Sequence, residues 1–420
     1  MDSGHSGRGD SDGVQPRKAA SAPETSAGMG GTTLIAATRP TRPHRRVGHP
    51  LARARAAASR SLSLPACLLA ALTFTVVALD PTASGAHSGP TCAGVPATQI
   101  SHRRHIAAKP HAVVVATGSR SHTITVAQGD KTHHRICGGP GDDAIEGGNG
   151  RDILTGGPGH DRIYGHGGND LIVGDNYNPN GDAVGHAGRD KLYGGRGNEV
   201  IMGDNLASGD ATGGKPDGLY GNTGAETIVG DSAVTGSGTA NGGAHDWVAA
   251  MRGDDLVVGD SFSRNGTAIG GGDDVLNHAL GSTLMIGDSA TLTGDASGGG
   301  NDTLHGASGG DFHQRCRDCD NRLYGDSYAL TKVGTDRGKG NDLLAAGLGD
   351  HTYLDGQGSD PHAGGRGKDL CAGNTYGHNV AVDCALYKRV QRVLEVPQPP
   401  PPLAELRRYG VWWPFRSASP

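Results

Sequence analysis

The sequence predicts an all-β fold of the solenoid type, in which one short unit recurs along the chain. Residues 138–173 repeat a nine-residue phrase, Gly-Gly-x-Gly-x-Asp-x-apolar-x, four times without a break, and a fixed short period is typical of solenoids. Glycine accounts for 73 of the 420 residues and aromatic residues for only 4%, so large side chains cannot fill an ordinary core. Residues 138–374 also hold 34 acidic and 16 basic residues, so a compact state needs cations to offset the repulsion.

The first part of the chain has the features of an export leader. A basic stretch at 45–60 precedes an apolar run at 62–79, and small residues follow at 84–88, which is the order of a secretory signal. We therefore predict a disordered leader and signal peptide over 1–86, cleavage near Ala86, and an extracellular mature chain without a stable membrane span. The alternative is that the apolar run stays in place as a membrane anchor. Association with the cell surface is also open.

Residues 87–137 are predicted to form an N-terminal capping region made of degenerate phrases. The stretches 117–125 and 129–137 keep the apolar eighth residue of the phrase. They place His122 and His134 where the sixth-position aspartate is expected.

Six cysteines follow the predicted leader, and an even number in an exported chain suggests disulfides. Two of them flank the entry to the repeats and two flank the exit, so pairing within each couple would hold the ends of the array together. The remaining two form a CxxC motif, for which a local disulfide is expected because a zinc site lacks its second ligand pair. The predicted pairs are Cys92–Cys137 at the entry, Cys371–Cys384 at the exit and Cys316–Cys319 between them.

The phrase itself predicts a turn followed by a short strand. Glycine tolerates backbone conformations with positive φ, so the Gly-Gly-x-Gly segment suits a tight turn. The x-apolar-x triplet suits a strand whose middle side chain points inward, and two phrases then complete a coil of eighteen residues. The sixth position carries Asp143, Asp152, Asp161 and Asp170, and the eighth carries Ile145, Leu154, Ile163 and Ile172.

These tandem phrases resemble the hemolysin-type calcium-binding repeats, or RTX nonapeptide repeats, of secreted bacterial proteins. The resemblance covers 138–374, with a degenerate extension upstream. It implies a parallel β-roll in which the sixth-position aspartates and turn carbonyls hold Ca²⁺ between stacked turns. Calcium is thus the expected cofactor, and because imidazole is a poor calcium ligand, His122 and His134 are expected not to bind it.

From residue 174 onward, each pair of phrases is separated by an insert of about ten residues that begins with Gly-Asp. If two phrases complete a coil, all inserts leave from the same edge of the roll, which we call the loop edge. The inserts are expected to be small solvated loops, with a recognition surface as the alternative. Their aspartates are either extra calcium ligands or caps for the insert backbone. They are Asp175, Asp204, Asp231, Asp260, Asp288 and Asp326.

The two edges of the roll differ in their sixth-position residues. After the inserts, at the loop edge, all are aspartates: Asp190, Asp217, Asp246, Asp274, Asp302 and Asp342. At the opposite edge the corresponding residues are Glu199, Glu226, Asp255, Thr283, a disturbed region near Asp311, and His351. We therefore predict that the main calcium ladder follows the loop edge. The opposite edge is expected to bind fully only near Asp152, Asp170, Asp255 and Asp369.

The C-terminal part, 375–420, is predicted to be a cap followed by a proline-rich tail. Leu386, Val390, Val393 and Leu394 have near-helical spacing, which predicts a short amphipathic helix over the last strand edge. The prolines at 397–403 suit a polyproline-like segment.

The sequence predicts a binding protein and not an enzyme. No HExxH motif is present, and the GxSxG match at 306–310 lies in a repeat turn instead of the strand-to-helix elbow that a hydrolase needs. The expected function is a secreted structural or adhesive module whose folding is driven by calcium. The alternatives are a calcium-dependent module that binds a carbohydrate, a protein or a cell-envelope component, and, more distantly, a non-catalytic part related to an RTX hydrolase. The acidic surface argues against nucleic acid as a partner.

Overall fold

The computed structural model describes residues 89–306 and, beyond them, 316–331, 335–338, 340–345, 349–355, 370–372, 378–382 and 386–388. The chain divides into the units 1–79 and 80–420, and every described residue belongs to the second. The predicted leader and the proline-rich tail lie outside the described residues.

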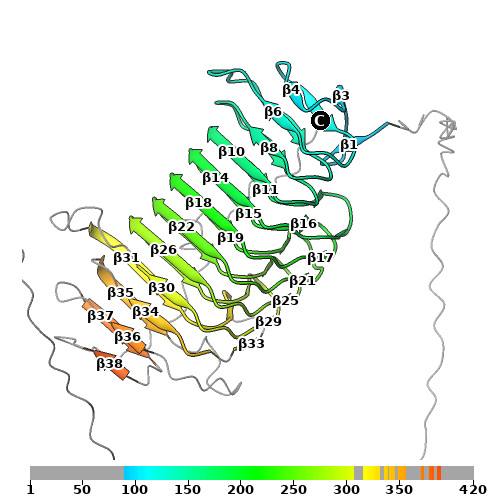
Figure 1. Ribbon diagram of the computed structural model, residues 1–420. Helices are drawn as coiled ribbons and strands as arrows, with labels where there is room; N and C mark the ends of the chain where they lie inside the picture. The colour runs from blue at the N-terminus through cyan, green and yellow to red at the C-terminus, as the bar shows by residue number, and fades with distance from the viewer. Residues whose placement is uncertain are drawn as a thin grey trace, which may run out of the picture. The chain divides into compact units, whose positions relative to one another are not determined.

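Two long parallel sheets form the body of the fold (Figure 1). The first sheet contains β4 (His105–Ala107), β6 (Thr123–Thr125), β8 (Ala144–Glu146), β10 (Arg162–Gly167), β14 (Lys191–Arg196), β18 (Gly218–Thr223), β22 (Trp247–Arg252), β26 (Val275–Leu280), β30 (Thr303–His305), β34 (Leu343–Ala345), β36 (Leu370–Ala372) and β38 (Leu386–Lys388). The second sheet contains β3 (Gln99–Ser101), β5 (Val113–Ala116), β7 (Arg135–Cys137), β9 (Ile153–Thr155), β11 (Leu171–Val173), β15 (Val200–Met202), β19 (Thr227–Val229), β23 (Asp255–Val258), β27 (Thr283–Ile286), β31 (Cys316–Tyr324), β35 (Gly349–Asp355) and β37 (His378–Val382).

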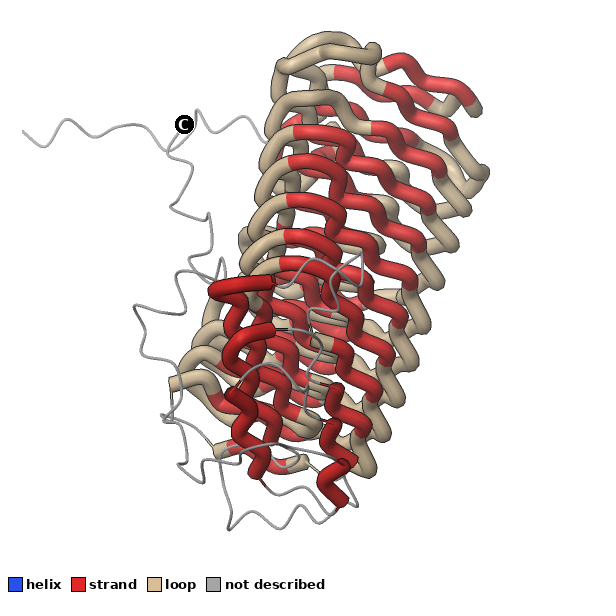
Figure 2. The backbone as a smooth tube through the Cα atoms, turned by 90° about the vertical axis from the view of Figure 1, so that its left-hand side faces the viewer, coloured by secondary structure: helices blue, strands red, loops and turns tan. Residues whose placement is uncertain are grey.

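The chain alternates between the two sheets, so each pair of phrases makes one coil, and the coils stack along one axis (Figure 2). The register joins equal positions of successive phrases, as when Ile163 of β10 pairs with Ile145 of β8 and Leu192 of β14. The eighth-position side chains point between the sheets and are fully buried. Each such side chain contributes roughly 1.5–3 kcal/mol of burial free energy. The predicted parallel β-roll is therefore confirmed, and no helix occurs among the described residues.

The inserts leave from one edge, as expected, but they are not solvated loops. Each carries two very short strands, and these stack into two further parallel sheets. The first insert sheet contains β12 (Tyr177–Asn178), β16 (Leu206–Ala207), β20 (Ala233–Val234), β24 (Phe262–Ser263), β28 (Ala290–Thr291) and β32 (Tyr328–Ala329). The second contains β13 (Ala183–Val184), β17 (Ala211–Thr212), β21 (Ala240–Asn241), β25 (Ala268–Ile269), β29 (Ala296–Ser297) and β33 (Asp336–Arg337).

The first insert sheet packs against the outward side of the second long sheet. Leu206 and Phe262 from the inserts are buried in one cluster with Met202 and Val258 from the long sheet. Small and polar insert sequences thus fold because each insert pairs its backbone with the inserts of neighbouring coils. Among the described residues, no element covers the outward side of the first long sheet over β10, β14 and β18, where side chains alternate between buried and exposed or half-buried.

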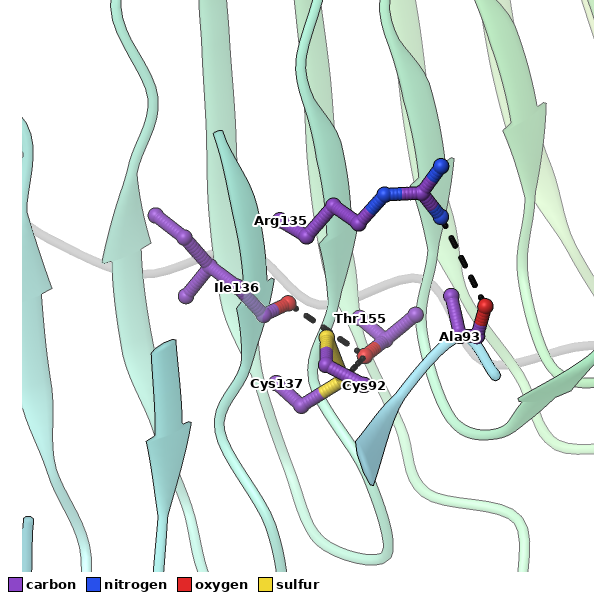
Figure 3. The surroundings of a disulfide bond; sticks show 6 residues. All are labelled: Cys92, Ala93, Arg135, Ile136, Cys137 and Thr155. Atoms are coloured by element: carbon purple, nitrogen blue, oxygen red, sulfur yellow. Dashed lines mark hydrogen bonds between the residues drawn. A yellow bond between two sulfur atoms is a disulfide. The ribbon is translucent and has the colours of Figure 1, made fainter. Parts of the chain in front are cut away.

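A disulfide closes the N-terminal end of the roll (Figure 3). β1 (Thr91–Cys92) and β2 (Val95–Pro96) form an antiparallel hairpin, and Cys92 of this hairpin is bonded to Cys137 of β7. This is the pair predicted for the entry to the repeats. The hydroxyl of Thr155, one coil further along, lies 2.9 Å from the Cys137 sulfur. The side chains of the other predicted pairs lie outside the described residues.

The C-terminal end departs from the sequence prediction. Residues 386–388 form β38, which pairs in parallel with β36, so this part of the predicted amphipathic helix is a strand. The backbone therefore continues the first sheet where a change to helical structure was expected. The rest of the predicted helix lies outside the described residues.

Within the described part of the chain, no helix has the length and hydropathy required to cross a bilayer.

Candidate metal centre

Eight buried aspartates form a continuous ladder along the loop edge, each just before a strand of the first sheet. The backbone N–H of each of the first seven donates to Oδ1 of the aspartate in the next coil, with N···O distances of 2.6–2.8 Å. We call this set the loop-edge column: Asp143, Asp161, Asp190, Asp217, Asp246, Asp274, Asp302 and Asp342. In the first seven, the second carboxylate oxygen, Oδ2, is buried and accepts no hydrogen bond.

Glycines make room for these second oxygens. A Cβ on Gly138 would lie 2.5 Å from Oδ2 of Asp143 and 2.6 Å from the carbonyl oxygen of Gly156. At the opposite edge, a Cβ on Gly165 would lie 2.6 Å from Oδ2 of Asp170 and 2.5 Å from the carbonyl oxygen of Gly194. A carboxylate oxygen and a carbonyl oxygen of the next coil therefore converge at each such turn. Hard oxygen donors of these two kinds are what calcium prefers.

The Gly-Asp aspartates of the inserts form a second buried column beside the first. Oδ2 of Asp175 accepts the backbone N–H of Gly188 at 3.0 Å, and Oδ2 of Asp204 accepts that of Lys215 at 3.2 Å. The other oxygen of each is buried and receives no hydrogen bond. These side chains therefore cap the insert backbone and also present an open oxygen. The full GD column is Asp175, Asp204, Asp231, Asp260, Asp288 and Asp326.

The two columns create a strong electrostatic conflict at the loop edge. Burial raises the pKa of Asp161 to about 10, and the neighbouring carboxylate of Asp190 adds to this shift. Burial also raises the pKa of Asp190 to about 8, with repulsion from Asp175. The pKa of Asp217 lies well above its ordinary value because of burial and the charges of the surrounding aspartates. Such groups ionise together only when a cation compensates them.

The opposite edge holds a shorter and less regular column. Both oxygens of Asp152 are satisfied, because Oδ1 accepts the backbone N–H of His134 and Oδ2 accepts that of Gly148 at 2.7 Å. Asp170, Glu199 and Glu226 retain buried oxygens without hydrogen bonds. Burial raises the pKa of Glu199 to about 8 and that of Glu226 to about 11.

Histidines take part at both edges. His122 and His134 begin the two columns, with Nδ1 3.0 Å from Oδ1 of Asp143 and 3.2 Å from Oδ1 of Asp152, respectively. His278 was not singled out from the sequence, yet its Nε2 lies 3.0 Å from Oδ2 of Asp255. His278 is in register with Met251 and, further back, with Asn222 and Gly195, and the register shifts next to it.

The sequence-based assignment of the sixth-position residue was wrong in two phrases of the opposite edge. Thr283 pairs with Asn321, not with the region near Asp311, and Asn321 pairs with Thr352, not with His351. Asp311 itself lies outside the described residues. The insertion before β31 therefore shifts the phrase, and polar uncharged residues follow Asp255 in this column. Asp369, another predicted ligand, also lies outside the described residues.

Among the described residues, no three His, Cys, Asp or Glu side chains converge on one point. An ion at either edge would therefore need main-chain carbonyl oxygens in addition to the carboxylates. The open carboxylate oxygens beside turn carbonyls fit this requirement.

A parallel roll with stacked carboxylates and turn carbonyls at its edges defines a metal-binding repeat protein. The family model of the RTX calcium-binding nonapeptide repeat matches in four copies, within residues 138–172, 180–205 and 297–312. The chain therefore carries RTX repeats and binds calcium, and such repeats are typically structural elements. Comparisons with curated proteins and with solved structures gave no match.

Proposed function

We propose that the protein is an extracellular structural or adhesive module whose roll forms at neutral pH only when calcium occupies its edges. The observation that carries this proposal is the loop-edge column, a row of buried carboxylates in which the second oxygens of the first seven aspartates accept no hydrogen bond. Burying so many acidic groups without compensation costs more than the narrow core can return. Calcium would offset that cost and link successive coils, so metal binding and folding become one process.

The proposed ligands follow from the open oxygens. At the loop edge, calcium would be held between coils by the loop-edge column, turn carbonyls and the open oxygens of GD aspartates such as Asp175 and Asp204. At the opposite edge, Asp170, Glu199 and Glu226 would hold ions less regularly, because Asp152 is already satisfied and Asp255 faces His278. This supports the hypothesis that the main ladder follows the loop edge. Among the Gly-Asp aspartates, Asp175, Asp204 and Asp260 would act as caps and ligands together.

Export supports the same function. RTX repeat proteins are usually secreted, and residues 45–88 have the order of a secretory signal. Extracellular calcium modules bind at about 0.1–1 mM, so the chain would stay unfolded inside the cell and fold outside it.

Circular dichroism of the mature chain during a calcium titration tests this proposal. We expect a largely unfolded spectrum in chelator and a cooperative gain of β-structure as calcium is added, with magnesium much less effective because it demands a smaller, stricter geometry. A full β spectrum in excess chelator at neutral pH, with the disulfide reduced, would refute coupled folding.

A further inference from the structure

The outward side of the first sheet carries a cluster of exposed basic side chains. A groove runs over this face at its N-terminal half and is lined by Arg104, Arg162, Arg189, Lys191 and Lys215. All five side chains are exposed. Among the described lining residues, Asp142 is the one exposed carboxylate, while Asp143 and Asp161 are buried members of the loop-edge column. The groove thus carries five exposed basic side chains against one exposed carboxylate, although the roll as a whole is acidic.

The basic groups are arranged in rows that follow the stack of coils. Arg162 and Lys191 are register partners on β10 and β14. His160 and Arg189 form a second row beside them, because the backbone N–H of Arg189 donates to Nδ1 of His160 at 2.8 Å. Neighbouring strands lie about 4.8 Å apart, so a linear ligand along the roll would meet Arg162, then Arg189 and Lys191, then Lys215 on three successive coils.

A stack of tyrosines continues the same face towards the opposite edge. The ring centroids of Tyr164, Tyr193 and Tyr220 are separated by 4.6 and 4.7 Å, and the rings are nearly parallel. All three are half-buried, and Tyr164 and Tyr193 line a second groove together with Arg196. The stack could have been predicted from the sequence, because each tyrosine is the ninth residue of its phrase and equal positions of successive phrases lie in register.

These features select the class of ligand. Clustered cations at regular intervals suit a chain of negative charges. The basic groove has no Phe, Tyr or Trp among its lining residues, and both ring faces of Tyr193 are covered by Tyr164 and Tyr220, so the face offers few platforms on which bases could stack. Phenol edges, together with Ser121 and Thr123 in the groove, offer hydrogen bonds to hydroxyl groups.

We infer that the outward face of β10, β14 and β18, with the basic groove beside it, binds an acidic polysaccharide that runs along the roll. The basic rows pair with its carboxylate or sulfate groups, and the tyrosine stack contacts its sugar units. This polysaccharide site goes beyond the calcium-dependent module proposed above. It depends on that proposal in one respect, since the face exists only when the roll is folded.

The test uses the full mature chain in excess calcium, with dextran sulfate as the probe and neutral dextran as the matched polymer. We expect dextran sulfate to bind and dextran not to bind, with an affinity that falls as salt rises. Arg162→Glu combined with Lys191→Glu should weaken binding at least about tenfold. The matched control, Lys131→Glu with Arg264→Glu, changes the net charge equally at exposed sites outside the groove and should retain wild-type affinity. Tyr193→Ala should weaken binding as well.

Circular dichroism on the same samples separates the two proposals. A chain that stays unfolded in calcium contradicts the calcium-dependent module, whereas a folded chain that ignores dextran sulfate contradicts this inference alone. Equal weakening by the groove and control variants would show that net charge, not this face, governs binding. Equally tight binding of single-stranded DNA or anionic lipid vesicles would overturn the assignment to a polysaccharide.

Discussion

The first seven aspartates of the loop-edge column use their two carboxylate oxygens differently. Oδ1 of Asp217, for example, accepts the backbone N–H of Asp190 at 2.6 Å, whereas its Oδ2 accepts none. The first oxygen aligns one coil on the next, and the second is left for a cation. An asparagine could take over the first task but would present an N–H₂ group in place of the second oxygen. This division of tasks explains why aspartate recurs at the sixth position.

The two edges give a direct test at the residue scale. We expect Asp217→Ala to lower the number of bound calcium ions more than Glu226→Ala. Asp217 lies among the carboxylates of Asp190, Asp204 and Asp246, while the neighbour of Glu226, Asp255, already faces His278. Calcium stoichiometry by isothermal titration calorimetry measures the difference. An equal loss in both variants would contradict the asymmetry between the edges.

The turn glycines give a second test, with a control in the adjacent strand. Gly224 has a φ of 150°, and a Cβ there would collide with the carbonyl oxygen of Gly197. Gly224→Ala should therefore destabilise the calcium-bound roll by about 1–3 kcal/mol, because it forces a strained backbone as well as the collision. Gly218→Ala should leave stability nearly unchanged, since its Cβ would meet nothing closer than the Tyr220 ring at 3.5 Å. Denaturant unfolding in calcium compares the two, and similar losses would contradict this account.

Much of the site was predictable from the sequence at this scale because its spacing is fixed. A sixth-position aspartate repeated every nine residues must return to the same edge after each coil, whatever the surroundings. The pairing of His278 with Asp255 was not predictable, because it depends on a turn in which a larger residue replaces glycine and folds its side chain back onto the column. The division of GD oxygens between cap and open site likewise needs the position of the insert backbone.

At the scale of elements, the strands of the long sheets were predictable and those of the inserts were not. A strand with an inward apolar residue leaves a clear signal, as at Ile201. The two-residue strands β16 and β17 leave none, because their backbones pair only with equivalent inserts one coil away. The strand β38 was mistaken for a helix because four apolar residues matched helical spacing, while its pairing with β36 is set by the preceding coil.

The disulfide between Cys92 and Cys137 should act locally on the N-terminal coils. Cys92 and Cys137 are 45 residues apart in the sequence, so replacing both by serine removes a long-range cross-link from the unfolded chain. The chain-entropy model gives a loss of about 4 kcal/mol in the free energy of unfolding. Each coil contacts only its neighbours, so the loss should be concentrated in β5, β6 and β7. Hydrogen exchange of the calcium-bound variant measures it strand by strand. Protection lost evenly up to β22 would show that the roll unfolds as one unit and contradict this prediction.

At the scale of the whole molecule, the columns couple folding to both calcium and protons. Burial raises the pKa of Asp161, Asp190 and Glu199 to about 10, 8 and 8, while the unfolded chain has carboxyl pKa values near 4. Without metal, the folded roll therefore holds protons at neutral pH that the unfolded chain has released. Its stability must fall as the pH rises from about 4 towards these folded pKa values, since folding then takes up protons.

Calcium and protons should accordingly compete for the buried carboxylates of the folded roll. In chelator, we expect β-structure to appear as the pH is lowered towards 5 and to disappear between pH 6 and 9. In calcium, the direction reverses: apparent affinity should rise with pH over the same interval, because each bound ion displaces protons from the columns. Calorimetric titrations in buffers of different ionisation enthalpy measure the protons released per calcium. Release of no protons at pH 7, or a metal-free roll that gains stability with rising pH, would mean that the columns ionise without help from the metal.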